Sequence, residues 1–220
     1  MKGALASWSG GKDSCFALMQ AVNQGMQPRA LLNMMNENGK VSRSHAIPRS
    51  VLQQQARAMG DIPLYMVPAS WSDYEREYIA ALKKIERAQQ IECVIFGDID
   101  LEPHREWEEK VSRAANLEAV LPLWQMDRIT LVHQMIAAEI EAVIVSCNTK
   151  LGLDFLGRGI TAGLIEELTA LGIDACGENG EFHTLVLNCP LFSNRIDVIF
   201  GEKLVHQDYC FIEMIAGKNE

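Results

Sequence analysis

The chain has 220 residues, of which 48% are hydrophobic and 22% charged, values typical of globular proteins rather than of disordered or fibrous chains. Its net charge of −9, with no visible cluster of lysine and arginine, argues against a nucleic-acid partner. No apolar run approaches the roughly 20 residues that cross a bilayer, and the N-terminus lacks the apolar region of a secretory signal. We therefore expect a cytoplasmic protein that makes no membrane contact; a homo-oligomer remains open.

The six cysteines are scattered through the chain without a Cys-x-x-Cys pair. Metal centres and iron–sulfur sites usually show such close pairs, and disulfide scaffolds are shorter and richer in cysteine. Several of the cysteines lie in apolar runs, where a free thiol behaves as a small hydrophobic group. We expect all six to be buried and reduced.

The first half of the chain alternates short apolar runs with amphipathic stretches. We expect strands at residues 4–8, 29–34, 64–67 and 94–96, and helices at residues 13–23, 48–59, 72–90 and 103–116. Apolar strands separated by helices predict an α/β domain, in which helices cover both faces of a Rossmann-like parallel sheet.

The character of the chain changes after residues 121–124, so we place a domain boundary at Pro122. The second part, residues 123–220, predicts a smaller α+β domain. Its expected elements are a helix at 129–138, a strand at 142–146, a glycine-rich passage at 152–163 and several short strands at 182–215, with a turn at 188–190.

The most informative segment is a short loop that follows the first expected strand and precedes the first expected helix. Glycines let backbone N–H groups approach phosphate oxygens, and the start of a helix carries unpaired N–H groups and a partial positive charge. The serines add hydroxyl donors, the lysine adds a point charge, and the aspartate can hold Mg²⁺. The loop consists of Ser9, Gly10, Gly11, Lys12, Asp13 and Ser14.

This spacing is not that of the Walker loop, whose lysine follows four variable residues and a glycine. It resembles the pyrophosphate loop of the N-type ATP pyrophosphatases. Further motifs appear in the order found in the diphthine–ammonia ligase family, and the resemblance covers nearly all of the chain. They are Gly97-Asp98-Ile99, Leu121-Pro122-Leu123-Trp124, Leu156-Gly157-Arg158 and the element from Gly177 to Thr184.

The resemblance implies a fold of the adenine nucleotide alpha hydrolase type, with residues 1–122 as the ATP pyrophosphatase domain and residues 123–220 as the acceptor domain. It also implies a ligase that uses ATP and Mg²⁺, adenylates a substrate carboxylate, releases pyrophosphate and amidates the carboxylate with ammonia. In the family the acceptor is diphthine, a modified histidine of translation elongation factor 2. Lys12 and Asp13 are the catalytic candidates in the loop.

Other candidates lie near the ends of expected strands. Gly97 and Asp98 follow a strand at its carboxyl end, where open parallel sheets bind ligands, and Asp98 could hold Mg²⁺ together with Asp13. The resemblance places His45 at the nucleotide. The alternative for these residues is a solvated loop or polar surface.

Several residues are candidates for acceptor binding. Arg105 and Arg158 could each clamp an anion with the guanidinium fork, and the alternative is a solvated side chain. Glu178 and Glu181 could converge from one turn and hold ammonium or take its proton. The alternative is a charged hairpin tip. Thr184 closes the same element and is a substrate-binding candidate through the resemblance.

The chain departs from the family pattern at His183 and at Asn188, which precedes Cys189-Pro190, where the family usually carries an acidic residue. These differences concern the acceptor rather than ATP. Two alternatives stay open, namely another adenylating enzyme acting on a small metabolite or tRNA base, and a nucleotide-sensing module without turnover. Both predicted domains are occupied by nucleotide and acceptor motifs, so we expect free ammonium, or a separate partner, to supply the nitrogen.

Overall fold

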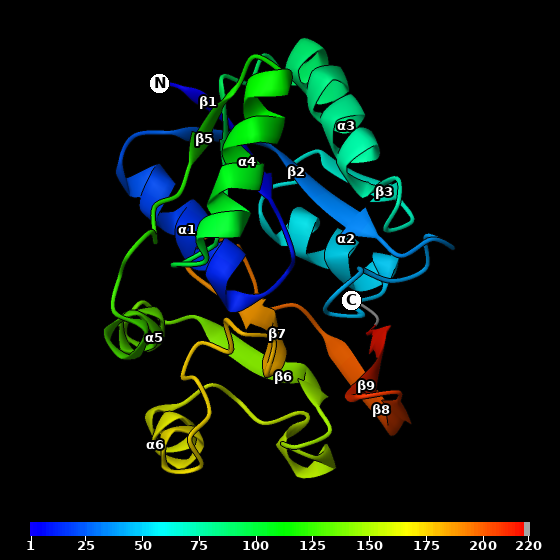
Figure 1. Cartoon of the computed structure of the whole chain (residues 1–220), viewed down its shortest axis with the longest axis vertical. Coiled ribbons are helices and arrows are strands. Elements are labelled where there is room, and N and C mark those ends of the chain that lie inside the picture. The colour runs from blue at the N-terminus through cyan, green and yellow to red at the C-terminus, as the bar shows by residue number, and fades with distance from the viewer. Residues whose placement is uncertain (218–220) are drawn as a thin grey trace.

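A computed structural model describes residues 1–217, and its first half is built on a parallel five-stranded sheet in the order β3-β2-β1-β4-β5 (Figure 1). Every neighbouring pair of strands in this sheet runs parallel. The strands are β1 (Gly3–Ser7), β2 (Gln27–Met35), β3 (Leu64–Pro68), β4 (Cys93–Ile95) and β5 (Glu118–Val120). The predicted parallel α/β fold is confirmed.

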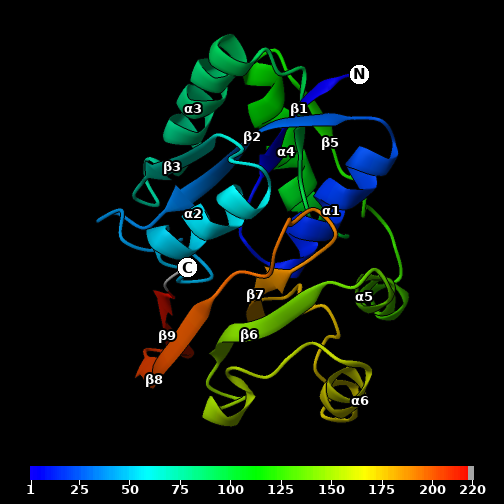
Figure 2. The ribbon, with the colours of Figure 1, turned by 180° about the vertical axis from the view of Figure 1, so that it is seen from behind.

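Helices cover both faces of this sheet, because successive strand residues point to opposite sides. Ala4 and Ala6 of β1 pack in one hydrophobic cluster with α1 and α2, whereas Leu5 packs in the other with α3 and α4. Figure 2 shows the face that α1 and α2 cover. The helices are α1 (Lys12–Asn23), α2 (Arg49–Ala58), α3 (Tyr74–Gln89) and α4 (Glu102–Ala114).

The second half is built on an antiparallel four-stranded sheet in the order β7-β6-β9-β8, as the predicted smaller α+β domain requires. Its strands are β6 (Glu141–Asn148), β7 (Phe182–Asn188), β8 (Val198–His206) and β9 (Tyr209–Ala216). Helices α5 (Arg128–Ala137) and α6 (Ala162–Ala170) and the 3-10 turn η1 (Leu153–Phe155) accompany it. The boundary at Pro122 stays a prediction.

The two halves share one hydrophobic core. Side chains of α1 and α2, such as Phe16 and Leu52, belong to the same buried cluster as Ile144 of β6 and Leu185 of β7. In Figures 1 and 2 the antiparallel sheet lies against the end of the parallel-sheet half where α1 begins. The loop of residues 9–14, predicted to bind phosphate, therefore lies at the junction of the two sheets.

Strand β5, helix α6 and the 3-10 turn η1 were not expected from the sequence. Strand β5 has only three residues, none of them buried, so no apolar run marks it. Helix α6 overlaps the glycine-rich passage and contains Gly163, a poor helix former.

Two expectations from the composition can be compared with the structure. All six cysteines are free and buried, which confirms their prediction. Among residues 1–217, no helix is both long and apolar enough to cross a membrane.

Candidate active site

The loop predicted to bind phosphate connects β1 to α1, and its two glycines are required by the packing around them. Gly10 has φ of +86°, and an added Cβ there would lie 2.8 Å from Ile47. An added Cβ at Gly11 would lie 2.6 Å from Cε1 of His45. Only glycine fits both positions without displacing its neighbours.

The first turn of α1 is kept open by a third glycine. An added Cβ at Gly97, directly after β4, would lie 2.8 Å from the backbone N of Ser14. Helix α1 has no side-chain cap at its N-terminus. Backbone N–H groups at a helix start carry a partial positive charge, so this end suits an anion.

The hydroxyl groups of the loop bond to one another. The Oγ atoms of Ser9 and Ser14 lie 3.0 Å apart, and the N–H of Gly11 donates to Ser9 Oγ at 3.2 Å. Ser14 Oγ also donates to the carbonyl of Gly11 at 3.1 Å. These contacts hold the loop in its shape.

Lys12 is only 2% exposed and points behind the loop rather than into open space. Its Nζ donates to Asp13 Oδ2 at 2.9 Å and to the carbonyl of Cys176 at 2.5 Å, and it lies 5.3 Å from the ring centroid of Phe182. Burial acts to lower the pKa of Lys12, but Asp13 and Cys176 outweigh it and the pKa is raised. The Lys12 ammonium thus ties the loop to the second half of the chain.

Thr184 also lies behind the loop. It is 1% exposed, and its Oγ1 accepts a hydrogen bond from the backbone N of Lys12 at 3.0 Å. Its carbonyl accepts from His45 Nδ1 at 2.7 Å. The structure therefore gives Thr184 the role of a brace for the loop and for His45, whereas the sequence suggested contact with the substrate.

A cavity of about 630 Å³ opens at the carboxyl ends of β1, β2 and β4. The strand order reverses between β1 and β4, and open parallel sheets bind ligands at such a switch point. Of the predicted site residues, six line the cavity: Ser9, Asp13, Ser14, His45, Gly97 and Asp98. Glu178 adds a seventh from the second half.

Asp98 is held in the cavity wall by two neighbours. His104 Nδ1 donates to its Oδ1 at 2.7 Å. Burial acts to raise the Asp98 pKa, but the hydrogen bonds from His104 and Glu108 lower it below its usual value. Glu108 is 3% exposed, and burial together with Asp98 raises its pKa to about 11. Asp98 is therefore the anion of this pair, and Glu108 is the proton donor.

The residues present fit a Mg²⁺ ion bound together with phosphate. Asp13 and Asp98 are carboxylates lining one cavity beside the open start of α1. Mg²⁺ commonly takes one or two protein carboxylates and completes its shell with phosphate oxygens and water. Among the described residues no three His, Cys, Asp or Glu side chains form a metal cluster.

Glu178 is the carboxyl group in this cavity that is poised near neutral pH. Its Oε1 accepts from the backbone N of Ile99 at 3.1 Å. Burial raises its pKa to about 7, with the negative charges of Asp13 and Asp98 adding to the shift and the Ile99 N–H opposing it. A group with this pKa can both accept and release a proton at pH 7.

The predicted convergence of Glu178 and Glu181 is not found. Glu181 accepts hydrogen bonds from the backbone N and the side-chain Nδ2 of Asn179, at 3.1 and 3.2 Å, and does not line the cavity. One turn carries both carboxylates, but only Glu178 turns inward.

The two predicted anion clamps also lie away from the cavity. Arg105 Nε donates to Glu109 at 3.1 Å, and its guanidinium stacks 5.2 Å from the ring centroid of Trp124. Arg158 forms two hydrogen bonds to Glu167, at 2.9 and 2.5 Å. Both guanidinium groups are paired with carboxylates of the chain at its surface.

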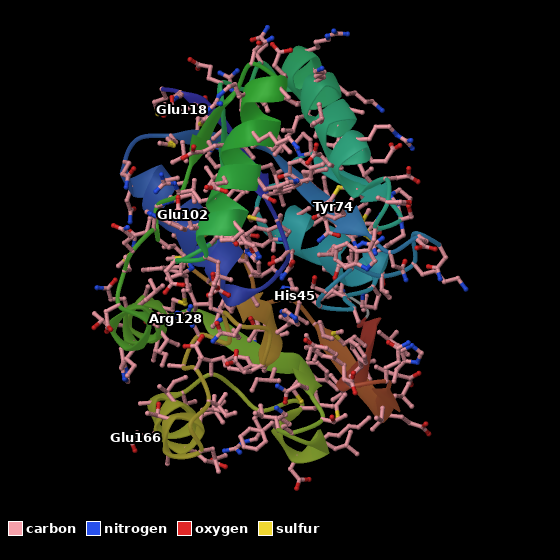
Figure 3. The ribbon with its side chains drawn as sticks, viewed as in Figure 1. His45, Tyr74, Glu102, Glu118, Arg128 and Glu166 are labelled. Atoms are coloured by element: carbon pink, nitrogen blue, oxygen red, sulfur yellow. The ribbon has the colours of Figure 1, made fainter. Side chains whose placement is uncertain are left out.

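Two histidines face the cavity as neutral rings. The carbonyl of Thr184 accepts from His45 Nδ1, so Nε2 of that ring is left as an acceptor. The rings of His45 and His183 have centroids 4.7 Å apart. Burial lowers the pKa of His45, and burial together with His45 lowers the pKa of His183 to about 3. In Figure 3, His45 lies at the junction of the two halves.

Sequence reasoning missed the aromatic end of the cavity. This end is lined by residues that were not singled out as site candidates, namely Arg43, Trp71, Tyr74, Trp107 and Glu108. The one available signal was the position of Arg43, beside His45 in the segment that follows β2.

Comparison with known proteins decides the family. The model described as "Diphthamide synthase N-terminal domain" matches residues 1–119, and that described as "Diphthamide synthase C-terminal domain" matches residues 127–219. The chain belongs to the diphthamide synthase family. It is thereby placed among ATP-dependent ligases.

Relatives in this family are similar over most of their length. The diphthine–ammonia ligase of Rattus norvegicus is 31% identical over 231 residues, covering 92% of this chain and 85% of the relative. The diphthine–ammonia ligase of Homo sapiens is 29% identical over 229 residues with the same coverage. A solved structure described as a predicted subunit of tRNA methyltransferase, from Methanocaldococcus jannaschii DSM, aligns with a TM-score of 0.46 and 16% identity over 86% of this chain and 98% of that one.

Proposed function

We propose that this chain is an ATP-dependent amide ligase that adenylates a substrate carboxylate, releases pyrophosphate and amidates the carboxylate with ammonia. One observation carries the proposal. The uncapped start of α1, the carboxylates Asp13 and Asp98, and the near-neutral Glu178 all face one cavity. Phosphate binding, metal binding and proton transfer can therefore act on the same substrate.

In the first half-reaction, the backbone N–H groups at the start of α1 would hold the phosphates of ATP. Asp13 and Asp98 would hold Mg²⁺, which neutralises phosphate charge when it is bound. A substrate carboxylate attacks the α-phosphorus, the bond to the bridging oxygen breaks, and pyrophosphate leaves. The protein contributes mainly position and charge.

In the second half-reaction, ammonia attacks the carbonyl carbon of the acyl-adenylate and AMP leaves. The attacking nitrogen must lose a proton as the C–N bond forms. Glu178 is our candidate for its acceptor, because its pKa of about 7 lets it be ionised when ammonia attacks. Free ammonium is the proposed nitrogen source.

The acceptor is proposed at the level of a carboxylate. Diphthine and ammonia are the substrates named for the relatives. This chain departs from the family pattern at His183, and His183 lines the cavity. We therefore extend the chemistry of the relatives to this chain and leave the molecule that carries the carboxylate to a screen.

Exchange of labelled pyrophosphate into ATP tests the proposal. The purified chain is incubated with Mg²⁺, ATP and a panel of carboxylates, and the products are separated by chromatography. We expect exchange that depends on a carboxylate, and AMP rather than ADP once ammonium is added. ADP as the product would refute adenylation, and ATP binding without any exchange would favour a nucleotide sensor.

A further inference from the structure

The aromatic end of the cavity carries a cation that the proposed chemistry does not yet use. Arg43 lies in the segment after β2, and its backbone N donates to the carbonyl of Met34 at 3.1 Å. Its guanidinium lies 4.5 Å from the ring centroid of Trp71 and 6.0 Å from that of Tyr74. The two aromatic rings are themselves 5.8 Å apart. Figure 3 shows Tyr74 at the start of α3.

Two nitrogens of this guanidinium are shielded from solvent and unpaired. Nε and Nη2 have no hydrogen-bond partner among residues 1–217. Stacking on aromatic rings engages the flat face of a guanidinium and leaves its N–H groups free in the plane. A shielded donor without a partner is costly, because it has given up its bonds to water.

The identity of the two unpaired atoms indicates the kind of ligand. The N–H of Nε and one N–H of Nη2 point the same way from one edge of the guanidinium, as two parallel donors. This edge matches the two oxygens of a carboxylate, or two oxygens of a phosphate, in a bidentate pair.

Among the described residues, Arg43 is the only lysine or arginine that lines the cavity. Four carboxyl groups line it, those of Asp13, Asp98, Glu108 and Glu178. Arg43 nevertheless forms no ion pair with any described residue. Its positive charge is therefore not balanced by a carboxylate of the described residues.

We propose that the Nε and Nη2 edge of Arg43, which lies beside Trp71 and Tyr74, binds a carboxylate of the acceptor substrate. This inference rests on the proposed function, since it deepens the account of the acceptor. A carboxylate is favoured over a nucleotide phosphate because the start of α1 already provides an anion site at the other end of the cavity. Trp71 is 71% exposed, so it can move aside and uncover the shielded edge of Arg43 for a ligand from solvent.

Direct binding tests the inference without requiring turnover. Acetate, glutarate and N-acetylhistidine, the last a carboxylate beside an imidazole, are titrated into the ¹⁵N-labelled protein in the presence of AMP. The resonance of the Arg43 Nε–H reports binding, and tryptophan fluorescence gives the Kd. We expect at least one carboxylate to shift this resonance downfield. If none does, the inference is overturned.

Three variants separate the effect of the two parallel donors of the Arg43 guanidinium from the effect of its positive charge alone. Arg43→Gln removes both, Arg43→Lys keeps the charge but loses the fork, and Arg76→Gln removes one charge from the exposed side of α3, where Arg76 is 71% exposed. We expect carboxylate binding to weaken by roughly tenfold or more in both Arg43 variants, as for the loss of a charged hydrogen-bonded pair, and to stay at its original strength in Arg76→Gln. Arg43→Lys serves alone if Arg43→Gln fails to fold. Equal carboxylate binding in all proteins would overturn the inference.

The nucleotide is the other source of an oxyanion, and a second arm excludes it. ATP, pyrophosphate and adenosine are titrated into the same four proteins. We expect the Arg43 variants to bind all three as the original chain does. If they lose ATP and pyrophosphate but not adenosine, Arg43 belongs to the phosphate site and the inference is wrong.

The outcomes for Arg43 and for the proposed function are distinguishable. Carboxylate binding through Arg43 without pyrophosphate exchange would refute the ligase and keep the binding site. Exchange that proceeds with the same KM for the carboxylate in Arg43→Lys would keep the ligase and refute the binding site.

Discussion

The raised pKa of Glu178 comes from the surroundings of its carboxyl group rather than from glutamate itself. The carboxyl is buried among Asp13 and Asp98 and receives a single backbone N–H, from Ile99. Burial and like charge disfavour its ionised form, so its pKa rises to about 7. Glu181, three residues later, bonds Asn179 outside the cavity. Two glutamates of one turn thus lie in different surroundings, and only Glu178 lines the cavity.

Glu178→Gln should therefore slow amide formation by roughly a hundredfold or more, as expected for the loss of a general base. The original chain should gain activity as pH rises through about 7, because a base must be deprotonated to accept a proton. The variant should lose this rise. AMP release is measured against pH, with the concentration of unprotonated ammonia held constant.

Glu181→Gln is the matched comparison, since it makes the same chemical change outside the cavity. An equal loss of rate in both variants would contradict the assignment of proton transfer to Glu178. ATP binding should stay unchanged in both.

His183 predicts a loss of stability in acid. Its pKa is lowered to about 3 in the folded protein by burial and by His45, against about 6.5 for an unfolded histidine. Below pH 6.5 the unfolded chain binds a proton that the folded chain does not. The stability from the neutral ring is therefore complete above pH 6.5 and is lost as pH falls toward 3, by at most about 1.4 kcal/mol per pH unit.

Urea denaturation across this pH range measures the effect. His183→Gln should unfold with a shallower dependence on pH than the original chain. His206→Gln, at an exposed position of β8, should keep the original slope. Parallel curves for all three proteins would contradict the neutral buried ring.

At the scale of elements, strand β7 braces the loop of residues 9–14. The backbone N of Lys12 donates to Thr184 Oγ1, and His45 Nδ1 donates to the carbonyl of Thr184. The loop is thus positioned by a strand from the other half of the chain.

Thr184→Val should leave the buried N–H of Lys12 without its acceptor and cost about 1–3 kcal/mol of stability. It should also weaken ATP binding, because the first turn of α1 loses its brace. Thr184→Ser retains the hydroxyl and should restore most of both. Denaturation midpoints and ATP titrations check this, and ATP affinity unchanged in Thr184→Val would show that the brace does not matter for the ligand.

The elements themselves were predictable where the pattern was strong. The continuous apolar run of β1, which is buried on both faces of the sheet, and the 3.6-residue amphipathic spacing of α3 are patterns that act within a segment. Strand β5 was not predicted, because its three half-exposed or exposed residues show no hydrophobic pattern. It forms by pairing with β4, which is a long-range interaction.

The candidate site divides in the same way. The loop of residues 9–14 was predicted because its glycines, lysine and aspartate are contiguous. The prediction that Arg105 clamps an anion overlooked Glu109. This glutamate stands at the i,i+4 spacing typical of a helical ion pair, and it pairs with Arg105. Arg43 and Trp71 were missed because they meet only after α2 and β3 have folded, and no local pattern connects them.

At the scale of the whole molecule, one buried amide joins three parts of the fold. Gln55 of α2 is fully buried. Its Oε1 accepts from Trp8 Nε1 at 2.9 Å, and its Nε2 donates to the carbonyls of Gly10 at 3.0 Å and Val186 at 2.8 Å. Loop, helix and β7 meet on this single side chain.

We therefore expect the chain to unfold in one cooperative transition, with coincident near-UV and far-UV signals. Gln55→Leu fills a similar volume but leaves the indole N–H of Trp8 unpaired and removes one hydrogen bond each from the carbonyls of Gly10 and Val186, and should destabilise the whole molecule by about 3 kcal/mol. A variant that melted only one half, seen as two separate transitions, would contradict a shared core.

The Lys12 ammonium on the carbonyl of Cys176 has a consequence for the history and the engineering of this chain. The loop of residues 9–14 in the first half depends on a carbonyl that the second half supplies. We therefore expect that the two halves cannot be exchanged between related enzymes as independent modules. A second half taken from another protein would have to supply its own counterpart of that carbonyl, or the buried ammonium of Lys12 would lose a hydrogen-bond acceptor.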